Sequence, residues 1–102
     1  MSIKKTYFKT KETCRVNFRL PREMVNDATS VYLVGEFNDW STRATPLKKL
    51  KTGVFTTNLE LPKGREYQFK YLIDQRRWEN DQGADKYVPT PFADSQNCVI
   101  VT

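Results

Sequence analysis

The sequence predicts an all-β protein, an immunoglobulin-like antiparallel β-sandwich of about seven strands. In most segments apolar and polar residues alternate with the two-residue period of a half-buried strand. Turn-forming Gly, Pro, Asn and Asp recur about every ten residues, and no segment has a convincing helical period. The 102 residues are enough for one small domain. We expect residues 13–102 to form the sandwich, after a flexible arm or edge addition at residues 1–12.

The first regular strand is expected at residues 13–20, because apolar side chains occupy every second position there. Pro21 ends this strand, since proline cannot donate a ladder hydrogen bond. Residues 22–30 are too short and too weakly periodic for more than a turn of helix. We therefore interpret them as a connection.

The next expected strand, Val31–Phe37, runs directly into a turn. Gly35 lies where the backbone must bend or approach a neighbour closely. Asn38 and Asp39 are residue types that close turns by bonding to their own backbone. The turn thus delivers Trp40 to the end of a strand, where its large ring is a candidate contact surface.

The second half of the chain contains several further strand patterns. They lie around residues 47–50, 54–61, 65–74, 78–79 and 97–102. In the third of these, Tyr67, Phe69 and Tyr71 share the face expected to point into the core, which puts Lys70 on the opposite face. The segment 86–96 contains two prolines and is expected to be irregular.

The ionisable residues of the sequence exclude several kinds of catalytic and metal site. The chain has no His, so a His-dependent triad, a His metal site and the usual neutral-pH proton shuttle are all absent. Acidic residues in the loop 79–85 match no EF-hand spacing, and a sandwich of this size rarely builds the cleft that a pair of catalytic carboxylates needs. We expect a solvated loop there, no catalytic residue, no metal and no cofactor. The net charge of +5 would suit an anionic partner only if the positive charges gathered on one face.

The two cysteines and the lack of long apolar runs indicate the cellular compartment of the protein. Cys14 and Cys98 are expected on the first and last strands, either as buried free thiols or as a disulfide. Nothing points to an oxidising compartment, which favours free thiols. No apolar run approaches the roughly 20 residues of a membrane span, and the first residues lack the apolar core of a signal peptide. We expect a cytoplasmic protein with no membrane partner.

An ordered set of motifs resembles the family 48 carbohydrate-binding modules. The set comprises residues 31–40, Leu61-Pro62-Lys63-Gly64, residues 67–74, Trp78 and Asn97. The family includes the glycogen-binding domain of the AMP-activated protein kinase β subunit, and the early-set domains that precede the catalytic barrels of isoamylase and glycogen branching enzyme. The resemblance covers about residues 29–102 and implies binding of α-1,4-linked glucan, such as glycogen or starch, in a shallow surface site.

The resemblance also implies which residues form that site. By analogy the stacking residues are Trp40 and Trp78, the sugar-bonding lysine is Lys70, the apolar residue inserted in the glucan curve is Phe92, and the polar contacts are Asp94 and Gln96, with Asn97 adjacent. The kinase domain has Leu, Thr and Asn where this chain has Phe92, Asp94 and Gln96. The turn before Trp78 also differs, because the family usually has Asp-Gly and one residue fewer.

The chemistry of these side chains suits a sugar without reference to the family. A pyranose has an apolar C–H face and a rim of hydroxyls, so it is bound by a flat aromatic ring together with a few hydrogen-bonding groups. Each residue also has a structural interpretation: a sandwich often buries a Trp such as Trp78, Lys70 would be a solvated lysine, and Gln96 and Asn97 would close a turn.

Three functions therefore compete. The first is a non-catalytic module that targets itself or a partner, such as a glycogen- or starch-active enzyme, to α-glucan. The second is an early-set type of interaction or adaptor domain, as a monomer or weak homodimer, that packs on a partner without binding sugar. The third is nucleic-acid binding, which the scattered charges and the lack of a known motif disfavour.

Overall fold

The computed structural model describes residues 3–25, 28–90 and 96–102. These residues form nine strands and two short 3-10 turns. The strands are β1 Ile3–Tyr7, β2 Thr13–Leu20, β3 Val31–Gly35, β4 Lys48–Lys49, β5 Phe55–Pro62, β6 Glu66–Ile73, β7 Arg77–Glu79, β8 Lys86–Pro89 and β9 Gln96–Val101. The turns are η1 Arg22–Met24 and η2 Glu36–Asn38. Within the described residues, no helix is long and apolar enough to span a membrane.

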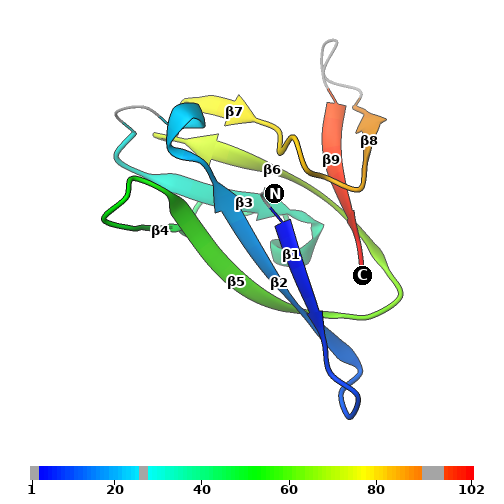
Figure 1. The fold of residues 1–102 in the computed structure, drawn as a ribbon. Helices are drawn as coiled ribbons and strands as arrows, with labels where there is room; N and C mark the ends of the chain where they lie inside the picture. The colour runs from blue at the N-terminus through cyan, green and yellow to red at the C-terminus, as the bar shows by residue number, and fades with distance from the viewer. Residues whose placement is uncertain (1–2, 26–27, 91–95) are drawn as a thin grey trace.

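The strands form two antiparallel sheets that face each other (Figure 1). Sheet A has the order β1-β2-β5-β4. Sheet B has the order β3-β6-β9-β8, and β7 also pairs with β6. This arrangement confirms the predicted all-β antiparallel sandwich, with two strands more than expected. The additional strands, β1 and β8, lie at sheet edges and have sequences too charged or too proline-rich for the alternation rule to detect.

The core lies between the sheets and follows the predicted alternation. Phe18 of β2 and Phe69 of β6 are fully buried, and their rings meet edge to face with centroids 5.3 Å apart. Tyr71 packs against Phe69 in the same geometry, at 5.8 Å. Tyr67 is partly buried against this cluster. The face of β6 predicted to point inward therefore does so, and the opposite face points away from the core.

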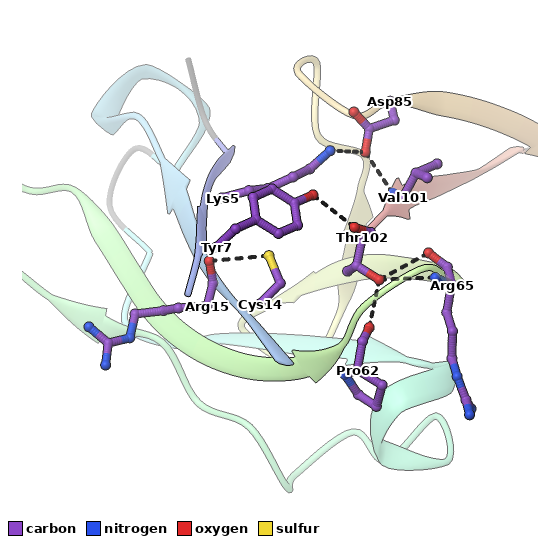
Figure 2. A network of polar contacts seen from close by, with 9 residues as sticks. All are labelled: Lys5, Tyr7, Cys14, Arg15, Pro62, Arg65, Asp85, Val101 and Thr102. Atoms are coloured by element: carbon purple, nitrogen blue, oxygen red, sulfur yellow. Dashed lines mark hydrogen bonds and ion pairs between the residues drawn. The ribbon is translucent and has the colours of Figure 1, made fainter. Parts of the chain in front are cut away.

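The N-terminal strand joins the two sheets (Figure 2). It pairs with β2 as an edge strand of sheet A, and its inward side chains reach across to sheet B. Lys5 Nζ lies 2.7 Å from Asp85 Oδ2, which also accepts a hydrogen bond from the Val101 amide. The Tyr7 hydroxyl donates to the Thr102 carbonyl over 2.8 Å. Residues 3–7 are thus held to the C-terminal end of β9 at the open side of the sandwich.

Both cysteines are buried and free. Cys14 lies on β2 and Cys98 on β9, in opposite sheets. Burial raises the pKa of the Cys98 thiol to about 11, so this thiol stays protonated and unreactive at neutral pH. The two residues serve as small apolar core residues.

Candidate functional site

The outer face of sheet B brings together Trp78 and Lys70. Trp78 on β7 lies directly opposite Leu72 on β6, and side chains that lie opposite each other point to the same face. Lys70 is two residues before Leu72 on β6, so it also points to that face. Trp78 is 47% exposed, so it is not the buried Trp of a sandwich centre. The two residues are therefore neighbours on one accessible surface.

Lys70 lies at a junction between two strands that share the same edge of β6. The β7 ladder reaches Tyr71 on β6, and the β9 ladder reaches Phe69, so Lys70 sits between their ends. The Asn80 side-chain amide donates to the Gln96 carbonyl over 2.9 Å and joins the end of β7 to the start of β9. The junction thus places the beginning of β9 beside Lys70.

The polar residues at the start of β9 divide between its two faces. Asn97 alternates with the buried Cys98 and points to the outer face, where its amide donates to Gln68 Oε1 over 3.0 Å. Gln96 is exposed, but it precedes Asn97 by one residue on β9 and so points to the opposite face of the sheet. Of the two candidate ligand residues Gln96 and Asn97, Asn97 is therefore the better placed beside Lys70. The predicted contacts Phe92 and Asp94 lie outside the described residues.

Trp40 is held by a turn that Asn38 organises. The Asn38 side-chain oxygen accepts from the Gly35 amide over 3.1 Å, and its nitrogen donates to the Leu33 carbonyl and to Thr45 Oγ1. The Trp40 amide then donates to the Gly35 carbonyl over 2.8 Å. The strand expected to continue to residue 37 ends at Gly35, because these side-chain bonds replace the ladder.

The backbone at Trp40 is strained. Asp39 has φ of 56° and Trp40 has φ of 59°, two consecutive left-handed residues with side chains. A left-handed conformation costs about 1–2 kcal/mol for a residue with a Cβ, and it is rare for a residue as bulky as Trp. The Asn38 network holds the turn that contains these residues, and Trp40 is 40% exposed. The strain lies at the ring that the sequence predicted to contact a ligand.

The loop that carries Trp40 is tied to the turn before Trp78. The Gln75 side-chain amide, in the turn before Trp78, donates to the Thr42 carbonyl, two residues after Trp40, over 2.9 Å. Asp74 and Gln75 have φ of 53° and 57°, the left-handed geometry that Gly adopts most easily. The turn thus adopts this geometry without a glycine. Gln75, at one of these two positions, makes the contact with the loop of Trp40.

Asp74 anchors the same turn to the connection before β3. Its Oδ1 accepts hydrogen bonds from the Ser30 amide, the Thr29 amide and the Thr29 hydroxyl, all within 2.9 Å. The amides of Ser30 and Thr29 lower the pKa of the Asp74 carboxyl, because they stabilise its charged form. Asp74 is therefore a structural support of the Trp78 hairpin.

Beneath the site the outer face of sheet B is apolar. Val34, Leu72 and Val99 are at most 4% exposed, although they point away from the inter-sheet cluster. Tyr32 lies opposite Leu72, so Tyr32, Leu72 and Trp78 form one row across three strands. The prediction did not include this floor. Its signal was the unbroken apolar run from Val31 to Val34, which is typical of a strand covered on both faces.

The loop 79–85 differs from the expected solvated loop at one residue. Asp81 is 1% exposed, and it accepts hydrogen bonds from the Tyr71 hydroxyl and the Gly83 amide, each over 2.7 Å. Burial raises the pKa of Tyr71 well above its usual value, so its hydroxyl remains a donor. Asp81 thus closes the end of the core between Trp78 and β8 and is a structural residue.

Comparisons with known proteins agree with this arrangement. Residues 23–99 match the family described as the glycogen recognition site of AMP-activated protein kinase. The match covers three quarters of the chain, and the chain belongs to this family of carbohydrate-binding modules. A curated relative, Protein PTST homolog 2, chloroplastic, from Arabidopsis thaliana, is 39% identical over 56 residues. That alignment covers 55% of this chain and 10% of the relative, so the chain spans only a small part of the relative's length.

Proposed function

We propose that the outer face of sheet B binds α-1,4-linked glucan without catalysis, through Trp40, Trp78 and Lys70. The observation that carries the proposal is the exposure of both tryptophans, at 40% and 47%, with the loop of Trp40 joined to the turn before Trp78 by the Gln75–Thr42 bond. An indole ring left this exposed offers a flat surface for the C–H face of a sugar, and Trp78 lies beside the apolar floor. Lys70 and Asn97 supply donors for the sugar hydroxyls.

The shape of the site supports an extended glucan over a small soluble sugar. Tyr32, Leu72 and Trp78 form one row across the sheet, in which Leu72 is buried and Trp78 exposed, and Trp40 follows the end of β3 by five residues. Such a surface contacts several sugar units along a chain and encloses none of them. Family membership supports glycogen or starch as the glucan. The role that follows is attachment of a partner, such as a glucan-active enzyme, to the polysaccharide in the cytoplasm.

Isothermal titration with maltoheptaose and β-cyclodextrin tests the proposal. Trp40→Ala and Trp78→Ala are each expected to weaken binding at least about tenfold, or about 1.4 kcal/mol, because each removes a stacking ring. Lys70→Met keeps the stem of the side chain and removes the donors, so it is expected to weaken binding less.

The matched control is Tyr7→Ala, which removes an aromatic ring of similar exposure, 51%, on sheet A. It also removes the hydroxyl bond to Thr102, so the comparison is made on the folded variant, whose glucan affinity is expected to be unchanged. If the wild-type chain releases no heat at millimolar sugar, or if Tyr7→Ala weakens binding as much as Trp78→Ala does, the glucan proposal is wrong. The exposed rings would then be contacts for a protein partner.

A further inference from the structure

The outer face of sheet A is basic. Alternation along β2 points Arg15, Asn17 and Arg19 away from the core, because the residues between them are buried. The residues opposite these three share the same face. They are Lys4 and Thr6 on β1, Thr56, Asn58 and Glu60 on β5, and Lys48 on β4 opposite Thr56.

Most of the net charge of the protein gathers on this face. The basic face, defined as Lys4, Lys11, Arg15, Arg19 and Lys48, carries five cations. One carboxylate, Glu60, lies on the same face, 3.3 Å from Lys11 Nζ. The surplus of four accounts for nearly all of the net charge of +5. Positive charges therefore gather on one face, as an anionic partner requires, and this face is opposite the glucan site.

The cations are available to a partner. Lys4, Arg15, Arg19 and Lys48 are exposed, and none of the four forms an ion pair within the part of the chain that the structure describes. Between Arg15 and Arg19, the Asn17 amide donates to Thr56 Oγ1 over 3.0 Å and to Asn58 Oδ1 over 2.8 Å. The centre of the face is thus neutral and hydrogen-bonded internally, with positive charge around it.

The arrangement of rings and arginines on the basic face favours an acidic peptide over single-stranded nucleic acid. Sheets that bind single-stranded nucleic acid stack bases on exposed rings. Phe8, a ring beside Arg15, is covered by Lys11 Nζ at 5.1 Å and the Arg15 guanidinium at 5.4 Å from its centroid. Arg15 and Arg19 are four residues apart on an extended strand, about 13 Å, with no charge between them. Carboxylates four residues apart in an extended peptide have the same spacing.

We propose that the basic face docks an acidic segment of another protein. Arg15 and Arg19 pair with its carboxylates, and Lys4 and Lys48 provide a surrounding positive field. This face and the glucan site lie on opposite sides of the sandwich, so both can be occupied at once. The proposal does not depend on glucan binding.

Fluorescence anisotropy with a labelled peptide of alternating Glu and Ser, about twelve residues long, tests the proposal. The peptide is expected to bind at low salt and to be released as screening increases. The double variant Arg15→Gln/Arg19→Gln is expected to weaken binding about fivefold or more. The control Arg43→Gln/Arg76→Gln removes the same charge from exposed loops elsewhere and is expected to change the affinity less than about twofold.

Three results would overturn the proposal. In one, the peptide does not bind even at low salt. In another, both double variants lose affinity equally, which would mean that only net charge matters. In the third, duplex DNA or anionic vesicles of matched charge bind more tightly than the peptide and depend on the same two arginines. Glucan titration of each variant shows separately that the fold and the sheet B site are intact.

Discussion

Replacing Gly35 with Ala tests the packing that positions the Trp40 turn. The Gly35 backbone is extended, with φ of −170°, so any residue could adopt its conformation. A Cβ at this position would lie 2.6 Å from the Gln68 carbonyl oxygen, 2.7 Å from the Phe69 Cβ and 2.9 Å from a ring carbon of Phe37. Two of these three atoms are fixed by the β6 backbone, so β3 and β6 must separate.

We expect Gly35→Ala to lower the free energy of unfolding by about 3 kcal/mol, because overpacking of this kind costs 1–3 kcal/mol and the clash is with backbone. For a domain of this size the melting temperature falls by about 15 °C. Urea denaturation followed by tryptophan fluorescence measures the change. Affinity for glucan should fall as well, since the Trp40 amide bonds to the Gly35 carbonyl.

Gly64→Ala is the matched control. Gly64 has φ of 72° and open space around its Cβ position, so this substitution carries only backbone strain of about 1 kcal/mol. The cost of Gly35→Ala is therefore steric, the cost of Gly64→Ala is conformational, and the first is expected to be the larger. If Gly64→Ala destabilises as much as Gly35→Ala does, the close approach of β3 and β6 is not what requires glycine at residue 35.

Two further predictions concern the turn before Trp78. Gln75→Gly removes left-handed backbone strain and also the bond to Thr42. The free energy of unfolding should therefore stay within about 1 kcal/mol of wild type, while the affinity for maltoheptaose falls. Unchanged affinity would mean that the Gln75–Thr42 bond does not position Trp40. The pKa of Asp74 is lowered in the folded state, so its stabilisation is present above the unfolded-state pKa and is lost as pH falls through the folded-state value. Asp74→Asn should therefore flatten the acid limb of the stability profile measured by urea denaturation, and an unaltered limb would contradict this.

Regular alternation allowed the central strands to be predicted. The extent of β2 agrees with the prediction, and β6 differs from it by one residue at each end, because their inward and outward side chains differ sharply in polarity. The edge strands were less predictable. β1 is rich in Lys and is held by long-range contacts of Lys5 and Tyr7, and β8 includes Pro89. Their pairing depends on partners far away in the sequence.

The resemblance named the candidate residues, and the structure shows how the chain holds them. Trp40, Trp78 and Lys70 were named from motifs, but the motifs do not contain the strand junction at Lys70 or the Gln75–Thr42 bond. These features arise from register between strands, which a local pattern does not encode. The basic face was missed for the same reason, since its cations come from separate segments that β1, β2 and β4 bring together.

The central claim, that both tryptophans contact one glucan, can be tested directly by NMR. The chain has two Trp residues, so a ¹⁵N spectrum contains two indole N–H signals to follow during titration with maltoheptaose. We predict that both signals shift and give the same dissociation constant. If either indole signal stays in place at saturating sugar, or if the two constants differ by more than about tenfold, Trp40 and Trp78 do not form a single glucan site.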